Sequence, residues 1–167
     1  AEVIKIETPG SGDPMRRLGN SHEGRCLWWP VLSRNKKSVT ANLRDPKGQD
    51  LVRRLISEAD VLVENFKPGT LEKWAMSPDE LMAINPSLII ARVSGFGQTG
   101  PYSDRPGFAS VGEAMGGLRY INGFPDQPPP RSGISLGDTL TGLFAAQGIL
   151  MALYWRDGLG GGRGEVI

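Results

Sequence analysis

The chain has almost none of the residues that form disulfides or bind transition metals. Among its 167 residues there is one cysteine, Cys26, and one histidine, His22. A lone cysteine cannot form an internal disulfide, so a reducing, cytoplasmic location is predicted. These two residues supply too few ligands for a zinc site, and no metal is expected. The sequence around them has no helical or strand pattern that would hold a Cys–His nucleophile pair.

Charge of one sign and long apolar runs are also scarce. The 19 Lys and Arg residues balance the 18 Asp and Glu residues to a net charge of +1, and no block of like charges occurs. A broad basic face for nucleic acid is therefore not expected. No run approaches the ~20 apolar residues of a membrane span, and no basic-then-apolar leader opens the chain. We expect neither a nucleic-acid partner nor a membrane.

The pattern that is present alternates short apolar runs with helical spacings. Strands are expected at 3–6, 38–43, 61–64 and 88–93, and helices at 46–59 and 78–84. A strand, helix, strand unit closes into a parallel pair with a right-handed crossover, so strands 38–43 and 61–64 are expected to pair. The predicted fold class is α/β, a mostly parallel Rossmann-like sheet with flanking helices. Residues 13–37 are expected to be irregular, with Trp28 and Trp29 packed over the core.

A further helix is expected from about Asp138 to Arg156, because its residues are apolar nearly all round, and such a helix is buried. The segments 95–107 and 122–137 are rich in glycine and proline and are expected to be loops. Parallel folds place their ligands in long loops at the carboxyl ends of strands. We therefore look for the functional residues beside these loops.

Two glycine motifs suggest nucleotide binding, and the residues around each argue against it. Gly95–Gly100 matches GxGxxG, but Pro101 follows at once and no helical period begins there. The dinucleotide fingerprint requires a helix at that point, so a glycine loop that approaches a ligand or a partner chain is favoured. Gly160–Gly164 follows a helix and lacks the Gly-Lys-Ser/Thr of a phosphate loop, which indicates a helix-terminating turn.

Three places could carry chemistry, and each has a plain structural alternative. Asp138 follows an uncharged, glycine-bearing approach at the start of the apolar helix, where it is either a helix cap or a nucleophile in a dry site. Asn65 and Phe66 follow a buried strand. They are either a small-molecule contact or part of a turn that leads into a helix with Thr70 as its N-cap. Arg44 and Lys73 are either solvated surface or partners of a phosphorylated ligand.

Five motifs occur in an order that resembles the class III CoA-transferase family. They are Pro9-Gly-Ser-Gly-Asp13 after the first strand, Asn35-Lys-Lys-Ser38, Val63-Glu-Asn-Phe-Lys-Pro-Gly69, Ser94-Gly-Phe-Gly-Gln-Thr-Gly-Pro101 and Leu136-Gly-Asp138. The resemblance covers essentially the whole chain. It implies that residues 1–167 are a partial N-terminal (large) CoA-binding domain. The first strand and helix and the C-terminal small domain would be absent, in agreement with two ends that resemble interrupted strands.

The resemblance also implies an activity and a set of site residues. Asp138 would be the nucleophile that moves CoA from an acyl-CoA to a small carboxylic acid through anhydride and aspartyl-CoA thioester intermediates. The residues implied to contact CoA are Asn65, Phe66, Thr70, Lys73, Ala41 and Arg44, with Arg44 and Lys73 at its phosphates. The glycine loop that relatives use for the oxyanions lies beyond residue 167, so the isolated fragment is expected to be inactive. An interlocked homodimer is implied for the full-length protein.

Two other functions stay open beside CoA transfer. Racemases of 2-methylacyl-CoA in the same family use a Gly-His-Asp stretch, where this chain has Gly107-Phe108-Ala109, so transfer is favoured. Some relatives place a basic residue near Pro106, where this chain has Arg105 instead. A non-catalytic CoA- or nucleotide-binding module is the second alternative. The acyl donor and acceptor are left open among oxalate, succinate, glutarate, carnitine and aromatic acids.

Overall fold

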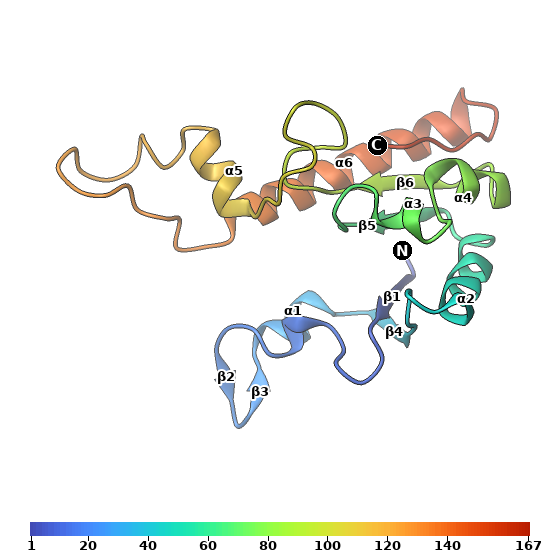
Figure 1. Ribbon diagram of the computed structural model, residues 1–167, viewed down its shortest axis with the longest axis horizontal. Helices are drawn as coiled ribbons and strands as arrows, with labels where there is room; N and C mark the ends of the chain where they lie inside the picture. Colours follow the sequence, from blue (N-terminus) through green and yellow to red (C-terminus); the bar gives the residue numbers. More distant parts are fainter. The chain divides into compact units, whose positions relative to one another are not determined.

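Two units make up the chain in the computed structural model, which describes all residues 1–167 (Figure 1). The unit Ala1–Leu55 holds β1 (Val3–Glu7), the 3-10 helix η1 (Pro14–Arg16), β2 (Ser21–His22), β3 (Arg25–Cys26), α1 (Trp28–Leu32), β4 (Lys36–Thr40) and α2 (Pro46–Ile56), which ends at the boundary. The unit Ile56–Ile167 holds β5 (Val61–Glu64), α3 (Thr70–Lys73), α4 (Pro78–Ile84), β6 (Ile89–Arg92), α5 (Ala109–Met115) and α6 (Leu136–Gly158). Each unit combines a parallel strand pair with helices, so the predicted α/β class is confirmed.

Parallel pairing of β1 with β4 organises the first unit. The ladder continues one bond past the strands, because the Ala41 amide donates to the Glu7 carbonyl (3.0 Å). The expected strand 38–43 stops short of its predicted end, since Asn42 opens the turn that leads into α2. The side-chain oxygen of Asn42 accepts from the Arg44 amide (3.1 Å).

The Asp45-Pro46 signal starts α2 as predicted. Asp45 Oδ1 accepts from the Lys47 amide (2.9 Å), which satisfies one free donor of the first turn. Gly48 is needed in this turn, because a Cβ there would lie 2.1 Å from the Asn42 carbonyl oxygen. The helix ends at Ile56, three residues before the predicted end at residue 59.

A buried carboxylate, Glu7, ties the loop after β1 to its surroundings. It accepts from Arg16 Nε (2.7 Å) and Nη2 (2.8 Å), from Ser38 Oγ (2.6 Å) and from the Asp13 amide (2.8 Å). The hydrogen bonds from Arg16 lower the pKa of Glu7 to about 2, against its burial, which raises it. Since the residue is only 4% exposed, the charge is tolerable only because every side of it is paired.

Short ordered elements occupy residues 13–37, which were predicted to be irregular. They are η1, the antiparallel β2–β3 hairpin and α1. Trp28 is 43% exposed, so it does not form the expected cover over a core. The guanidinium of Arg16 lies over the ring of Trp29, 3.9 Å from its centroid. Elements this short contain too few periods for a sequence pattern to detect.

Parallel pairing of β5 with β6 forms the sheet of the second unit. Its centre is the run Leu88–Ala91, in which every residue is buried. Val166 adds a parallel bridge beside Ile90, so the residues after Gly164 extend this sheet as the sequence indicated. A Cβ on Gly164 would lie 2.0 Å from the Leu88 carbonyl oxygen, which explains why only glycine lets the chain approach there.

One predicted strand pair is wrong. Strands 38–43 and 61–64 were expected to be parallel neighbours, but the partner of β4 is β1 and the partner of β5 is β6. The intervening helix indicated parallel topology correctly. It did not identify the neighbours, because sequential strands in an α/β fold are adjacent only about two-thirds of the time.

Local signals predicted α4 and its ends correctly. Ser77 Oγ accepts from the Glu80 amide (3.3 Å) while Glu80 Oε2 accepts from the Ser77 amide (2.8 Å), which is a capping box. Asn85 ends the helix, and its Nδ2 donates to the carbonyls of Ile56 (2.9 Å) and Ala59 (2.8 Å). The amide side chain therefore joins α4 to the chain segment that precedes β5.

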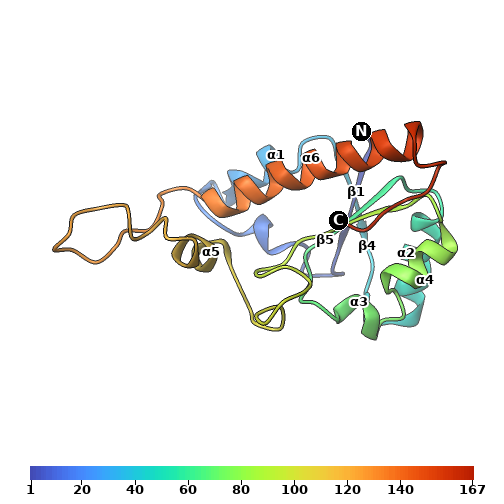
Figure 2. The same cartoon turned by 90° about the horizontal axis from the view of Figure 1, so that it is seen from above.

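The prediction that α6 is buried is wrong for this chain. Figure 2 shows α6 as one long, unbroken helix, and Ala152 is its only buried residue. Arg156 Nη1 donates to the Ser87 carbonyl (3.3 Å) just before β6, and the contacts of the helix are with β6 and α5. These contacts use one face, so the apolar residues on the other faces are left exposed, among them Leu143, Leu150 and Tyr154.

The same helix is long and apolar enough to cross a membrane, judged by length and composition alone. This differs from the expectation that no segment of the chain approaches a membrane span. The core helices of soluble proteins meet the same measure, so a single helix of this kind is weak evidence for a membrane.

Replacing Glu7 by Gln is expected to remove the contribution of the charged carboxylate to the unfolding free energy, which protonation of Glu7 at acidic pH also removes. The folded pKa is lowered to about 2 from an ordinary value of 4.5, so charged Glu7 stabilises the fold fully above pH 4.5 and loses this contribution as the pH falls toward 2. At neutral pH the Glu7→Gln variant should lose about 2 kcal/mol of unfolding free energy. The difference from the parent should shrink as the pH falls through that window.

Urea unfolding followed by circular dichroism across this pH range measures both effects. Glu2→Gln is the control, because Glu2 makes an exposed ion pair with Lys37 (2.6 Å) and should contribute little. A Glu7→Gln deficit that stays constant from neutral pH to the acid limit would contradict the ion-pair account.

Candidate functional site

The carboxyl ends of β5 and β6 lie at one edge of the sheet in the second unit. Glu64 and Arg92 are opposite in register, and the Val93 amide donates to the Glu64 carbonyl (2.9 Å). The segments that begin at Asn65 and Ser94 therefore leave the sheet from neighbouring positions. This is the edge at which parallel α/β folds bind ligands.

Four predicted site residues share the segment that follows β5: Asn65, Phe66, Thr70 and Lys73. Asn65 and Lys73 are exposed, and Lys73 is the last residue of α3. The ring of Phe66 meets Trp74 edge to face, with the centroids 5.3 Å apart. The segment is thus folded back on itself, with an amide and an ammonium group open to solvent.

The position of Thr70 differs from one of its two interpretations. Gly69, with a φ of 82°, is the N-cap of α3, and Thr70 is the first residue of the helix. The interpretation of Thr70 as N-cap is therefore wrong. A positive φ is favourable for glycine, which lets the chain reverse between Lys67 and the helix.

An ion-pair network, not predicted from the sequence, holds both ends of this segment. Arg92 Nε donates to Glu64 Oε1 (2.7 Å), and Arg92 Nη1 donates to Glu72 Oε1 (2.7 Å). The other Glu64 oxygen accepts from the Phe66 amide (2.7 Å). The side chains of Glu64 and Arg92 are 2% and 8% exposed. Hydrogen bonds from Arg92 lower the pKa of Glu72, against its burial, which raises it.

A signal for this network is visible in the sequence after the fact. Both β5 and β6 are apolar strands that end on a charged residue, Glu64 and Arg92, of opposite sign. Paired strand ends of opposite charge predict an ion pair once the register is known. Without the register, the two residues cannot be matched.

The glycine loop after β6 uses two of its glycines to contact itself, while its predicted approach to a ligand or partner chain stays a prediction. A Cβ on Gly95 would lie 2.5 Å from Gly107 Cα, so the two glycines close the loop by direct backbone contact. Gly97 and Gly100 adopt φ values of 79° and 92°. Between Gly95 and Ala109 no helix begins, which excludes the dinucleotide fingerprint as predicted.

The aromatic and basic residues of this loop form their own cluster. Phe96 packs edge to face on Tyr102 with centroids 5.6 Å apart, and the Arg105 guanidinium lies 4.2 Å from the Tyr102 ring centroid. The positive charge of Arg105 is thereby placed on an aromatic face. Arg105 is exposed, in the stretch just before Pro106.

Asp138 lies in the first turn of α6 but is not its cap. The helix begins at Leu136, with Ser135 at the N-cap position, so the interpretation of Asp138 as a cap is wrong. The Asp138 side chain is exposed. A carboxylate in the first turn is favoured by the partial positive charge of the helix N-terminus. Its carboxylate is therefore open to solvent in this chain, unlike the dry site that the nucleophile interpretation assumed.

Gly137, beside Asp138, permits close contact between two helices. A Cβ on Gly137 would lie 2.8 Å from Ala109 Cβ, at the first residue of α5. The start of α5, an element that the sequence analysis missed, is thereby placed against the first turn of α6. Phe108, the N-cap of α5, makes no capping hydrogen bond, so the sequence held no start signal.

Several buried polar atoms around α5 and the glycine loop have no hydrogen-bond partner in this chain. The buried atoms without a partner are Ser94 Oγ, Gln98 Nε2, Glu113 Oε2 and Arg119 Nε. Buried polar atoms in proteins are nearly always paired. These segments therefore have unused donors and acceptors that a ligand or further protein can satisfy.

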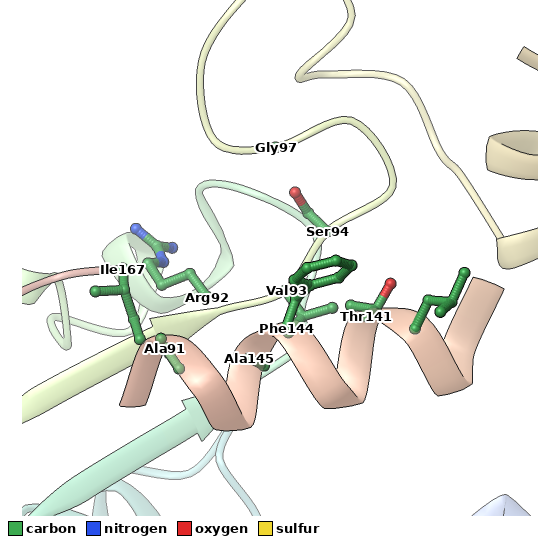
Figure 3. Close-up of a pocket in the computed structure, with 11 residues that line it drawn as sticks. Ala91, Arg92, Val93, Ser94, Gly97, Thr141, Phe144, Ala145 and Ile167 are labelled. Carbon is green, nitrogen blue, oxygen red and sulfur yellow. The ribbon is translucent and has the colours of Figure 1, made fainter. Parts of the chain in front are cut away.

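A cavity of about 390 Å³ lies between β6, the glycine loop and α6 (Figure 3). Val93, Ser94 and Gly97 line it on one side, and Thr141, Phe144 and Ala145 line it from the helix. None of the predicted site residues is part of this lining. The cavity is mostly apolar, and it adjoins the turn of α6 that follows Asp138.

The two remaining predicted residues belong to the first unit. Ala41 is 6% exposed directly after β4, and Arg44 is exposed in the turn before α2. The exposed cations Arg44 and Lys73 each follow a parallel strand and suit an anionic, phosphate-bearing ligand. The chain has no group of three or more His, Cys, Asp or Glu residues placed to hold a metal ion.

The sequence is similar to enzymes that transfer CoA. It is 61% identical over its whole length to succinyl-CoA–D-citramalate CoA-transferase of Chloroflexus aurantiacus, of which it covers 41%. It is 42% identical to a formyl-CoA:oxalate CoA-transferase of Rhodopseudomonas palustris, with 98% of this chain and 38% of that protein covered. The chain thus spans about two-fifths of the length of these relatives.

Solved structures have the same fold over nearly the whole chain. A CaiB/BaiF family protein from Brucella suis matches with a TM-score of 0.91 and 40% identity, over 99% of this chain and 44% of that one. A protein from Mycobacterium tuberculosis matches with a TM-score of 0.89 and 36% identity, over 99% of this chain and 46% of that one. The family model described as CoA-transferase family III matches residues 1–167. The chain therefore belongs to CoA-transferase family III.

Proposed function

We propose that the complete protein that contains this chain transfers CoA from an acyl-CoA thioester to a small carboxylic acid. The observation that carries the proposal is the 61% identity, over the full length of the chain, with succinyl-CoA–D-citramalate CoA-transferase. The chain would be part of a large, CoA-binding N-terminal domain. Since it spans 41% of that relative, the groups that stabilise the oxyanions would lie elsewhere in the protein, and the isolated chain is expected to be inactive.

In the proposed mechanism Asp138 is the nucleophile. Its carboxylate attacks the thioester carbonyl, the C–S bond breaks, and CoA departs as the thiolate. The acyl group is then bound to Asp138 as a mixed anhydride. The thiolate then attacks the aspartyl carbonyl, which releases the donor acid and forms an aspartyl-CoA thioester. The acceptor carboxylate attacks this thioester to give a second anhydride. Return of the thiolate to the acceptor acyl group yields the new acyl-CoA and restores Asp138.

The local structure supports this role for Asp138. Ser135, and not Asp138, occupies the N-cap position, and no side-chain capping bond forms at this helix start, so the Asp138 oxygens are not committed to the helix backbone. The contact between Gly137 and Ala109 fixes the backbone next to it. A rigid backbone below an uncommitted carboxylate is what positioning of a nucleophile requires.

CoA contacts are proposed in each unit separately: in the segment after β5 and in the turn after β4. Lys73 and Arg44 would pair with phosphates, which accept charge-assisted hydrogen bonds. The Asn65 amide and the Phe66 ring would contact the less charged parts of the cofactor. Ala41 and Thr70 would contribute small surfaces that allow CoA to approach the backbone.

Short dicarboxylic acids are the proposed substrates. The relatives are named for succinyl-CoA with citramalate or malate, and for formyl-CoA or acetyl-CoA with oxalate. We therefore place a succinyl donor and a small hydroxy-dicarboxylate acceptor first. Racemisation is disfavoured, because Gly107-Phe108-Ala109 offers no second acid or base.

A cytoplasmic homodimer is the proposed form of the complete protein. The exposed apolar residues of α6, including Leu143, Leu150 and Met151, would be covered there. Exposed apolar surface of this extent marks a contact with further protein. No nucleic-acid or membrane partner is proposed.

Replacing Asp138 by Asn in the complete protein should abolish transfer, with a rate loss of about 10³-fold or more, because an amide is a poor nucleophile for a thioester. Hydroxylamine added during turnover of the parent should modify Asp138, as mapped by mass spectrometry. Asp126→Asn, which changes an exposed acid of the neighbouring loop, is the control and should retain activity. Full activity of Asp138→Asn would overturn the mechanism.

Lys73→Gln should raise KM for acyl-CoA about tenfold with little change in kcat, because one charged hydrogen bond to phosphate is lost. Arg44→Gln should behave alike. Lys36→Gln is the matched control, since Lys36 is an exposed cation at the opposite end of β4 from Arg44. Steady-state kinetics at two salt concentrations test this, and an unchanged KM in both site variants would contradict the phosphate contacts.

The substrate proposal is tested with succinyl-CoA and a panel of acceptors. Citramalate and malate should be used with kcat/KM at least about tenfold above that of acetate or carnitine, the discrimination expected when a site pairs a second carboxylate. Chromatographic separation of the acyl-CoA products gives the ratios. Equal use of monocarboxylates would contradict the proposed substrate class.

A further inference from the structure

We propose that Glu64, Arg92 and Glu72 form a clamp that positions the segment 65–73, with Arg92 as a positioning residue and not a CoA ligand. The inference rests on the proposed CoA site, since the clamp matters for function only if that segment binds the cofactor. It adds residues to which neither the sequence nor the family relationship assigned a role. The contacts on both ends of the segment carry it.

The first half of the clamp fixes the start of the segment. Glu64 is the last residue of β5, and one of its carboxylate oxygens accepts from the Phe66 amide (2.7 Å). The other oxygen accepts from Arg92 Nε (2.7 Å). The path of the chain through Asn65 is therefore set by a carboxylate that is itself held by the neighbouring strand.

The second half fixes the end of the segment. Glu72 lies on α3, immediately before Lys73, and accepts from Arg92 Nη1 (2.7 Å) and Nη2 (3.4 Å). One guanidinium thus joins both ends of the segment to β6. Its planar, multiple donors allow it to bridge two carboxylates, which a lysine ammonium group does less well. Asn65, Phe66 and Thr70 lie between these two anchors, and Lys73 directly follows the second.

The same geometry disfavours Arg92 as a phosphate ligand. Three of its five N–H groups already donate to carboxylates, and the side chain is only 8% exposed. Two acidic side chains against one basic one leave the clamp with a net negative charge, which repels phosphate. The clamp therefore acts on CoA only through the segment that it orders, by lowering the entropy lost when the ligand binds.

A matched control exists in the same unit. Arg156 is also an arginine with little exposure (11% of its side chain) that bridges two carboxylates, with Nη2 3.0 Å from Asp60 and Nε 2.7 Å from Asp157. It lies in the last turn of α6, beside Ser87 at the start of the β6 strand. Removing Asp157 therefore disturbs the same kind of ion pair at the other end of the sheet, away from the segment 65–73.

The test compares Glu72→Gln with Asp157→Asn in the complete protein. Glu72 is chosen because its side chain is 38% exposed, so the fold tolerates the change, whereas loss of Arg92 would leave the buried Glu64 carboxylate without a positive charge beside it. Kd for CoA by calorimetry, KM and kcat for acyl-CoA, and Tm are measured for each. Glu72→Asp is the conservative variant that keeps the charge.

Glu72→Gln should raise Kd and KM about five- to tenfold with kcat changed less than about twofold, as expected when the ligand must order its own binding segment. Glu72→Asp should recover part of the affinity. Asp157→Asn should change Tm as much as Glu72→Gln does and leave Kd unchanged. An equal Kd in parent and Glu72→Gln would overturn the clamp while leaving the CoA site intact. Absence of CoA binding by the parent would overturn the proposed function and the clamp together.

Discussion

In each unit, the hydrogen bonds accepted by a buried glutamate at the carboxyl end of a parallel strand hold the loop that follows the strand. Glu7 ends β1 and Glu64 ends β5, with 4% and 5% of each residue exposed. Each accepts from an arginine and from a backbone amide of the loop that follows, at Asp13 in one unit and at Phe66 in the other. Parallel strands end abruptly at the edge where ligands bind. At Glu64 one oxygen accepts from the arginine and the other from the loop amide. At Glu7 the arginine contacts both oxygens and the loop amide shares one of them. In both cases the carboxylate joins the end of the strand to the loop that follows.

How far the sequence predicted the fold depended on how local each signal is. The helix 78–84 follows from Ser77-Pro78 at its start and Asn85-Pro86 at its end, all within one helical turn of its ends, and the structure reproduces it to the residue. Strand 61–64 and the turn at Gly160 were predicted for the same reason. The partner of β4 was not, because parallel pairing joins residues far apart in sequence and the pattern of one strand does not identify its neighbour. The Glu64–Arg92 pair was missed with it, since it exists only when β5 and β6 are in register.

In the candidate site, too, local motifs were recognised in the sequence and long-range contacts were not. Motif order identified Asn65, Phe66, Thr70 and Lys73, and the structure brings these four together in one folded segment. It could not show that Arg92 anchors the segment, nor that α5 starts against Gly137, because Phe108 carries no capping signal. For α6 the composition predicted burial, and the chain itself covers only one face of the helix. Apolarity shows that a surface has to be covered; it does not show which part of the protein covers it.

The position of Asp138 within its helix decides how its carboxylate can be used. At the N-cap, its oxygens would accept from the backbone amides of the first turn and be poor nucleophiles. The helix instead begins at Leu136, which places Asp138 in the first turn, where the helix dipole favours its charge but no capping bond occupies it. Gly137 makes this early start possible, because any side chain there would collide with Ala109. The glycine before the aspartate therefore has a physical purpose: it lets two helix ends meet and leaves the carboxylate beside them uncommitted.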